Sequence, residues 1–449
     1  MVNEDINCID KPSNKDKSLK AFFYNHKLLF ILIGITIIIA AIRYISIIFM
    51  PDVFSDEEVI LKHIEAIRNT GHDYYNNKAS LFMVVGAGYT TYVYLYPMIF
   101  FSFFLGNITP EKARIIQQTL TIASCILLAF GVRNWFNKNN KLFWITLFTS
   151  LTLPWGFVQA NRIWDPSFVA IYFSLFFFFF SVLMKNDKID IKYKGDNKKF
   201  IISSNIRGYI YSSLVSISLV LLATVYPPAR IPAVFMWVFV FIWLLIKKRI
   251  NIFMAIVMVV VASLTALPLA YYIFFNDEFN SRSQSLLVFQ SDKSFQTSLL
   301  LWVKNTINLF NPTFLFFTGD LIYRHSLPVF GLLGTINLIP LVYLFYKRKK
   351  SSNSLNWFLL GVILMTCIST GLTNDYSPHS LRSCLCFLPY SILIAQGWLL
   401  IFRTKTRYGK YVFLGLIISF FILYFTFYVL IGTGTLKFEN AGFDIYYFK

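Results

Sequence analysis

Apolar segments of about 20 residues recur along the whole chain, and this pattern limits the fold more than any other feature. A helix of that length spans the hydrocarbon core of a bilayer. Only 14% of the 449 residues are charged, whereas soluble domains carry roughly a quarter. We therefore expect an all-α polytopic membrane protein. Its transmembrane helices, about eleven in number, are predicted at 28–50, 113–132, 142–160, 167–184, 208–225, 231–246, 252–275, 328–346, 357–371, 383–402 and 411–431.

Basic residues are concentrated in alternate connecting segments. If the N-terminus is cytoplasmic, the inner segments hold 26 of the 41 Lys and Arg residues and only 7 acids. The outer segments then hold 14 basic residues and 15 acids, and Arg43 lies inside the first span. This distribution follows the positive-inside rule and explains the net charge of +19 without a nucleic-acid partner. We predict an integral protein of a bacterial inner or plasma membrane, with its N-terminus in the cytoplasm.

The segment 80–106 is apolar enough to be a further span, but counting it would place every later basic segment outside. We therefore expect a re-entrant or interfacial hairpin there, within a large first outer loop at 51–112 that carries juxtamembrane helices. A second large outer loop is expected at 276–327. The predicted organisation is a cytoplasmic tail (1–27), a transmembrane domain (28–431) and a short outer tail (432–449).

Three consecutive acids follow the first span, in the stretch VFSDEEVILKHIEAIRNTGHDYY at 53–75. Ser55 and Glu58 have the spacing of a capping box, and the apolar residues that follow predict an amphipathic helix over 56–70. Asp56 and Glu57 fall in its first turn, where the helix dipole favours negative charge. The acids are therefore either helix caps or part of a site on the outer face.

Other ionisable residues occur at the outer ends of later spans. An isolated arginine at such a place usually extends into the lipid headgroups, and an isolated loop histidine is usually structural. Several such groups converging on one face form a functional-site hypothesis. The groups are Arg162 and Asp165; Tyr226 and Arg230; Asp320, Arg324 and His325; and Asp375, His379 and Arg382.

Carboxylates and arginines together suit the transfer of a group from a phosphate. A carboxylate can act as general base for a hydroxyl nucleophile, and arginines can bind a phosphate leaving group through two parallel hydrogen bonds. The chain has no P-loop, GxGxxG, HExxH or GxSxG motif in a suitable context. Since nucleotide sugars and ATP are absent from the outer face, an activated donor must arrive there on a lipid.

From about residue 28 to 402 the chain resembles the GT-C fold glycosyltransferases that use polyprenyl-phosphate sugars. This is the superfamily of protein mannosyltransferases and lipid A aminoarabinose transferases, and the chain is similar to its small bacterial members. The resemblance lies in the order of the motifs FSDEEVILKHIEAIRNTGHDYY, TTYVYLYP, LGNITPEKAR, NRIWDPSF, YPPARIP, NPTFLFFTGDLIYRHSLPVFG and PHSLRSCLCFLPYSILIAQG.

The resemblance implies an inverting transferase that moves a sugar from a polyprenyl-phosphate carrier to a hydroxyl of a surface glycan, lipid or protein. It gives Asp56 the role of general base, with Glu57 beside it for positioning and Asp165 as a second acid. The remaining implied residues are donor-phosphate ligands (Arg230, Arg324 and Arg382) and further substrate contacts (Tyr226, His325 and His379). The first outer loop has no Asp-x-Asp, which argues against a tightly bound metal. No cofactor is certain, and a divalent cation stays open because the second acid holds one in some members.

Other functions remain open at this stage. A flippase or transporter for lipid-linked glycans would place charged residues in the middle of its spans, whereas here Arg43 is the main exception to uncharged spans. An O-antigen-type polymerase would also use arginine-rich outer loops, but it gives no account of the acidic first loop. A purely structural membrane protein is the third alternative.

Overall fold

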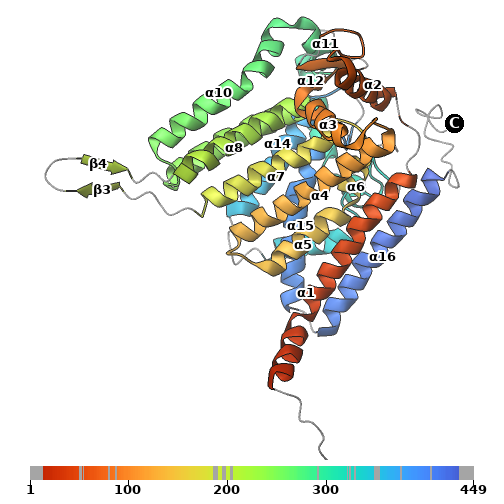
Figure 1. Cartoon of the computed structure of the whole chain (residues 1–449), viewed down its shortest axis with the longest axis vertical. Helices are drawn as coiled ribbons and strands as arrows, with labels where there is room; N and C mark the ends of the chain where they lie inside the picture. The colour runs from red at the N-terminus through yellow and green to blue at the C-terminus, as the bar shows by residue number, and fades with distance from the viewer. Residues whose placement is uncertain are drawn as a thin grey trace, which may run out of the picture.

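The structure is a computed structural model, and it is described here for residues 14–49, 53, 55–78, 81–85, 88–185, 191–194, 199–202, 206–290, 293–320, 322, 325–327, 330–347, 354–374, 377–404 and 407–433. Its long helices form one bundle (Figure 1). They are α1 (Asn14–Ile45), α4 (Pro110–Trp135), α5 (Asn140–Thr152), α7 (Pro166–Leu183), α8 (Ile206–Val225), α9 (Arg230–Ile246), α10 (Ile252–Phe275), α14 (Ser354–Gly371), α15 (Phe387–Thr404) and α16 (Arg407–Gly432).

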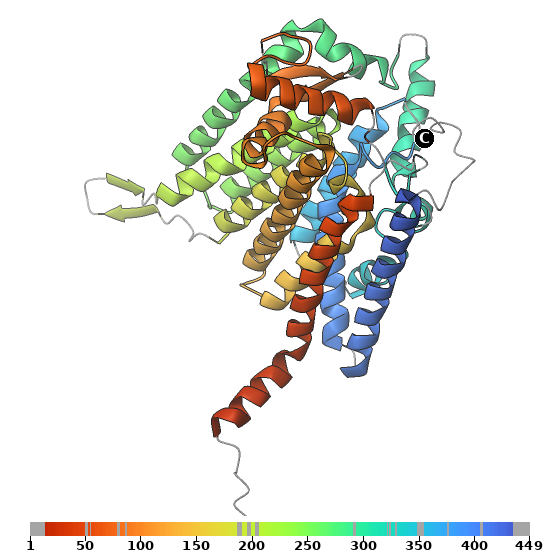
Figure 2. The ribbon, with the colours of Figure 1, turned by 45° about the vertical axis from the view of Figure 1, so that its right-hand side comes forward.

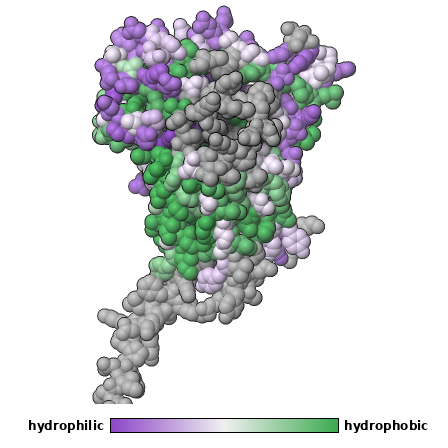
Figure 3. All heavy atoms as spheres, turned by 90° about the vertical axis from the view of Figure 1, so that its right-hand side faces the viewer, coloured by the Kyte–Doolittle hydropathy of each residue, from purple (hydrophilic) through white to green (hydrophobic). Residues whose placement is uncertain are grey.

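The predicted fold class is confirmed. In the described part of the chain, eight helices are long and apolar enough to cross a membrane, and a bent pair of helices raises this number to nine. The predicted number of eleven is therefore not confirmed. Figure 3 shows, on the face turned to the viewer, a hydrophobic area of the bundle below a hydrophilic cap. This division is the one expected of a bundle whose middle lies in lipid.

The predicted span 142–160 consists of two helices rather than one. Helix α5 ends at Thr152, and α6 (Pro154–Ala160) continues after a bend of 63°. Pro154 has no N–H to continue the ladder of α5, so the helix breaks there. The next residue, Trp155, donates its N–H to the carbonyl of Leu332, 2.9 Å away in a distant part of the chain. The break thus creates a packing site for another segment.

That other segment corrects the predicted helix at 328–346. Residues 330–334 have no regular structure, η4 (Thr335–Asn337) is a single 3₁₀ turn, and α13 (Leu338–Lys347) begins only afterwards. Gly331 has φ +61°, and a Cβ there would lie 2.3 Å from the Phe316 carbonyl carbon. The segment is apolar because it is buried: Leu333 donates its N–H to Leu315 at 2.7 Å, and neither residue is exposed. Irregular backbone is tolerated at membrane depth when protein surrounds it.

The segment between α1 and α4, predicted as the first outer loop, folds onto one end of the bundle. It contains α2 (Ser55–Thr70), a hairpin of β1 (Phe82–Val85) and β2 (Gly88–Thr91), and α3 (Tyr92–Leu105). The hairpin is antiparallel, with Phe82 opposite Thr91 and Val85 opposite Gly88. Figures 1 and 2 show α2 and α3 gathered with α11 (Asp277–Ser285) and α12 (Phe295–Asn308) at this end. A second hairpin, β3 (Ile191–Lys194) and β4 (Lys199–Ile202), projects away from the bundle.

Helix α2 has the amphipathic pattern predicted for it. Ile60 and Ile64 are buried, and Gly71, with φ +73°, ends the helix by donating its N–H to Ile67. Glu58, the predicted capping-box residue, instead forms an exposed ion pair with Lys62 one turn later, at 2.7 Å. The helix thus packs its apolar stripe against the bundle, and its three acids lie in its first turn.

Candidate active site

Residues 161–165, between α6 and α7, lie at the centre of the predicted site residues. Helix α6 ends at Ala160 and Pro166 begins α7, so a short non-helical connection is left between them. Asn161 fixes its start: its Oδ1 accepts hydrogen bonds from Gln118 at 2.8 Å and from Ser46 at 3.2 Å. Gln117, on α4, donates its amide to the carbonyl of Arg162. The connection is therefore held by α4 and by Ser46, the residue that follows α1.

Glu57, in the first turn of α2, binds the same connection. Its Oε1 accepts the N–H of Ile163 at 2.7 Å, and its Oε2 lies 3.5 Å from the Arg114 guanidinium on α4. Glu57 is 1% exposed and Arg114 is 3% exposed, so this is a buried ion pair. Asp56, the preceding residue, is exposed in the first turn of α2. The two neighbouring acids thus have different surroundings: one is fixed inside the protein and the other faces outward.

Asp165 closes the connection beside the β hairpin. Thr90, on β2, donates its hydroxyl to Asp165 Oδ1 at 2.6 Å. Although Asp165 keeps some exposed surface, burial raises the pKa of its carboxyl to about 7, against the opposing effect of the Thr90 hydrogen bond. A carboxyl group with such a pKa can exchange a proton near neutral pH.

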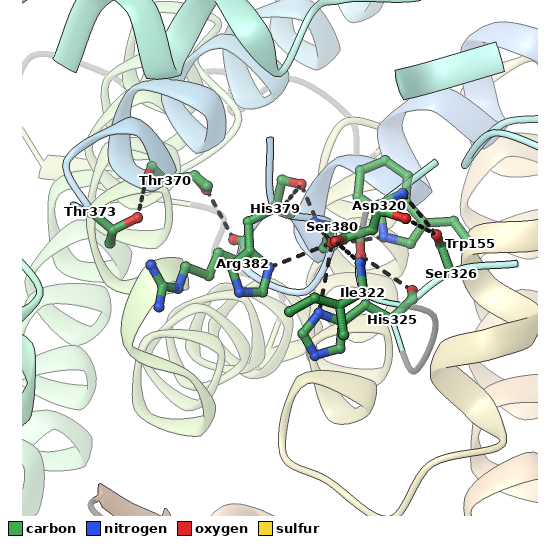
Figure 4. Close-up of polar contacts among 11 residues, drawn as sticks. Trp155, Asp320, Ile322, His325, Ser326, Thr370, Thr373, His379, Ser380 and Arg382 are labelled. Carbon is green, nitrogen blue, oxygen red and sulfur yellow. Dashed lines mark hydrogen bonds and ion pairs between the residues drawn. The ribbon is translucent and has the colours of Figure 1, made fainter. Parts of the chain in front are cut away.

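Asp320, His325 and His379 form a second cluster from two later outer segments (Figure 4). Asp320 Oδ2 lies 3.7 Å from His325 Nδ1 and 3.8 Å from His379 Nδ1, and all three side chains are buried. Burial acts to raise the pKa of Asp320, but the facing imidazoles and the Ile322 amide outweigh it and lower the pKa to about 2. The Ser380 N–H also donates to Oδ2, at 2.7 Å. The carboxylate is thus the centre of this cluster.

Aromatic residues join the two clusters. The Trp164 ring lies 5.7 Å from the His325 ring, measured between centroids. Trp155, at the start of α6, donates its indole N–H to the carbonyl of Ser380 at 3.2 Å, within the second cluster. Glu57 and His325 therefore both contact residues 161–165, through Ile163 and Trp164 respectively.

Two of the predicted phosphate ligands are anchored at one place, the end of α14. Ser369 donates its hydroxyl to the carbonyl of Pro228, two residues before Arg230. Its neighbour Thr370 donates to the carbonyl of Arg382, at 3.0 Å. Both arginine side chains are half-buried. The end of α14 thus holds the two turns that carry these positive charges.

Aromatic contacts connect this place with the β hairpin. The Arg230 guanidinium lies 5.1 Å from the centre of the Phe279 ring, and Phe279 contacts Tyr89 on β2 with ring centroids 5.3 Å apart. Tyr226, half-buried, directly precedes η2 (Pro227–Ala229), the turn that begins α9. Arg324 and Asp375 lie outside the described residues.

Thr90, Arg114 and Trp164 also belong to the site, but they were not predicted from the sequence. Arg114 occurs in the motif LGNITPEKAR, where only its charge at a span end was visible, and the same signal is given by arginines that face lipid. Asp320 was noted among the polar groups but received no role. In the structure it binds two backbone amides and faces both histidines.

Comparison with known proteins gives the fold. No protein-family model matches the chain, and no curated protein matches its sequence. Among solved structures, the oligosaccharyltransferase of Archaeoglobus fulgidus tethered to an acceptor peptide aligns with a TM-score of 0.50 and 11% identity, over 92% of this chain and 56% of that one. The same archaeal enzyme, AglB, in complex with an inhibitory peptide and a dolichol-phosphate, aligns with the same score and identity over 91% and 56%.

A third structure, ArnT from Cupriavidus metallidurans bound to undecaprenyl phosphate, has a TM-score of 0.49 and 9% identity over 91% of this chain and 75% of that one. The chain spans just over half the length of the archaeal proteins that it matches. At such low identity the likeness concerns the fold. The chain shares its fold with GT-C membrane glycosyltransferases, as the resemblance in sequence predicted.

Proposed function

We propose that the protein is an inverting glycosyltransferase that takes a sugar from a polyprenyl-phosphate carrier on the outer face of the membrane. The acceptor is a hydroxyl group of a surface glycan, lipid or protein. The observation that carries the proposal is a GT-C-like bundle in which Glu57 and Asp165 meet at residues 161–165 and the end of α14 holds the turns that carry Arg230 and Arg382. A described complex of one structural neighbour contains a dolichol-phosphate, which is a carrier of this chemical class.

Asp56 is the general base in this proposal. The acceptor oxygen attacks the anomeric carbon as the bond between that carbon and the phosphate oxygen breaks. The acceptor proton passes to the Asp56 carboxylate, and the polyprenyl phosphate leaves with the electron pair of the broken bond. A single displacement of this kind inverts the anomeric carbon. Asp56 suits the role because it is exposed in the first turn of α2, where an acceptor from the solvent can reach it.

Glu57 is a positioning residue, because its carboxylate is already bound to Ile163 and paired with Arg114. It fixes α2 against residues 161–165 and so determines where Asp56 stands. Asp165, on the other side of that connection, shapes the acceptor site from beneath the β hairpin. In this proposal Glu57 and Asp165 together position the acceptor hydroxyl.

Arg230 and Arg382 bind the donor phosphate and stabilise its charge as the bond breaks, and we assign the same role to Arg324. Tyr226 contacts substrate next to Arg230. His325 and His379 are buried, and the ring of His325 packs against that of Trp164 beside the site. Arg230 and Arg382 supply positive charge from two turns that are both anchored at the end of α14, which suits them to stabilise a departing phosphate.

The test is Asp56→Asn in membranes supplied with a radiolabelled polyprenyl-phosphate sugar, with transfer to endogenous glycan as the readout. Loss of a general base is expected to lower the rate by about 10²–10⁴-fold. The matched control is Glu58→Gln, an exposed acid two positions later, which should transfer at the unmutated rate. Transfer by Asp56→Asn near that rate would remove Asp56 as the base.

The same experiment separates the alternative functions. A flippase would move the labelled lipid between leaflets and leave the sugar on its carrier. An O-antigen-type polymerase would join glycans that are already linked to lipid, so a single labelled sugar would not be incorporated. Either result for the unmutated protein contradicts the transferase.

A further inference from the structure

Three buried side chains that can bind a metal ion lie together where two outer segments meet (Figure 4). Asp320 and His325 come from the segment that precedes α13, and His379 comes from the segment that follows α14. One ligand atom from each residue can be chosen so that all lie within 4.8 Å of one another. None of the three residues is more than 5% exposed. A carboxylate and two imidazoles are thus enclosed in the same small volume.

The distances are those of a site close to metal-binding geometry. The two His Nδ1 atoms lie 3.7 and 3.8 Å from the same Asp320 oxygen. Ligands bound to a tetrahedral zinc ion at about 2.0–2.2 Å lie roughly 3.4 Å from one another. Each imidazole would therefore approach the carboxylate by a few tenths of an ångström, and the two imidazoles would also move toward each other, from a separation of their ligand atoms within 4.8 Å.

The surrounding hydrogen bonds hold the carboxylate in place for this geometry. The Ile322 N–H donates to Asp320 Oδ1 at 3.0 Å, and the Ser380 N–H donates to Oδ2 at 2.7 Å. The Ser326 hydroxyl binds the backbone of Asp320 on both its N–H and its carbonyl. Partners of this kind orient the ligands of metal sites and are as much a part of the site as the ligands themselves.

The two histidines are oriented together. Their rings are nearly parallel, with an angle of 17° between planes and 5.0 Å between centroids. Both therefore present Nδ1 to the carboxylate from one side. Imidazoles are ligands that zinc prefers, and two of them with one carboxylate leave a fourth position for water or another oxygen. A dipositive ion would also compensate the buried carboxylate, whose charge is otherwise costly to enclose.

We propose that Asp320, His325 and His379 bind a zinc ion that joins the last two outer segments. The ion would tie residue 379 to residues 320–325 across α13 and α14. Because the Trp164 ring lies against the His325 ring, it would also fix one side of residues 161–165. Its role is structural: it positions the connection that carries Asp165 and does not touch the reacting atoms. The proposal is independent of the sugar-transfer reaction.

The first test is the zinc content of the purified full-length protein, prepared in detergent without a polyhistidine tag and measured by inductively coupled plasma mass spectrometry. We expect about one zinc per chain in the unmutated protein. His325→Gln and His379→Gln, which keep similar volume, should bind zinc at least about tenfold more weakly in a competition titration with a chromophoric chelator. The control is His72→Gln, since His72 is exposed on the first outer loop and should leave the content unchanged.

The second test uses the unmutated protein alone, so that a folding defect in a variant cannot decide the outcome. Cobalt(II) added to the zinc-free protein should give the visible absorption bands of tetrahedral coordination. Zinc at one equivalent should then abolish those bands. Absence of the bands together with zinc at background level overturns the proposal, and so does full zinc retention by both monodisperse histidine variants. Loss of zinc with unchanged sugar transfer supports the site and leaves the proposed function intact.

Discussion

Replacing Glu57 by Gln tests the proposal that this acid positions α2. The substitution keeps an oxygen that can accept the Ile163 N–H but removes the negative charge beside Arg114. At 3.5 Å, two unit charges in a medium with an effective dielectric constant of about 20 attract each other by about 5 kcal/mol. Since both side chains are buried, the variant leaves an uncompensated guanidinium, which typically costs about 3–5 kcal/mol. We expect the free energy of unfolding to fall by that amount.

The buried cysteines provide the assay. Cys125, Cys367, Cys384 and Cys386 are all buried and free, so a thiol-reactive fluorophore reports their exposure as the detergent-solubilised protein unfolds. Unfolding is followed at increasing fractions of sodium dodecyl sulfate and compared with the Glu58→Gln control, whose ion pair is exposed and should be worth less than about 1 kcal/mol.

A double-mutant cycle isolates the pair. Arg114→Gln alone should also destabilise the protein, whereas Glu57→Gln combined with Arg114→Gln should cost several kcal/mol less than the sum of the two single changes. If Glu57→Gln unfolds together with the unmutated protein, or if the coupling is below about 1 kcal/mol as for exposed pairs, the buried pair does not hold α2 in place. The positioning role of Glu57 would then be refuted.

Three further predictions follow from the site and from the bundle beneath it. Asp165→Asn keeps an acceptor for Thr90 but cannot ionise. Because the pKa of Asp165 is raised to about 7, the unmutated protein loses stability as pH rises from about 4 to 7, so the unfolding temperature of the variant relative to the unmutated protein should increase over that range and then level off. A relative unfolding temperature that decreases with pH contradicts this. Arg43→Lys loses a guanidinium that donates to three acceptors. In the same thiol assay, the free energy of unfolding should fall by about 1–3 kcal/mol for each acceptor left unpaired. An unchanged free energy of unfolding would show that these hydrogen bonds do not stabilise the bundle. Arg230→Gln and Arg382→Gln should each lower kcat/KM about tenfold or more in a titration of the polyprenyl-phosphate donor, whereas an effect on the acceptor alone would place them elsewhere.

Hydropathy and charge were sufficient to predict the membrane class and the positions of most spans, because each of those helices must cover its length with apolar side chains. Hydropathy could not separate a spanning helix from an apolar segment buried in protein. Residues 330–334 are apolar for the second reason, and the requirement for glycine at position 331 comes from the Phe316 backbone, which is distant in sequence.

The candidate site was predicted as a set of residue types at one face, and the structure differs in how they are used. Asp56 and Glu57 are adjacent and chemically alike, so the sequence could not tell which is exposed. The difference arises because Ile163 and Arg114 bind Glu57, and both lie more than fifty positions away from it in the sequence. In the same way, nothing local to His325 or His379 indicates that Asp320 lies between them.

Arg43 has a consequence for the order in which the protein is assembled in the membrane. Its guanidinium binds Gln118 and the carbonyls of Leu151 and Gly156, partners that follow it by 75, 108 and 113 residues. When the first span leaves the ribosome, none of these partners has been synthesised. An arginine at membrane depth then costs about 2.5–3.5 kcal/mol on insertion scales. The first span is therefore expected to remain beside the insertion machinery until α4, α5 and α6 emerge. The carbonyl of Leu151, at the break before Pro154, and the carbonyl of Gly156, in α6, accept two of the hydrogen bonds of Arg43, so its charge is satisfied only late in synthesis.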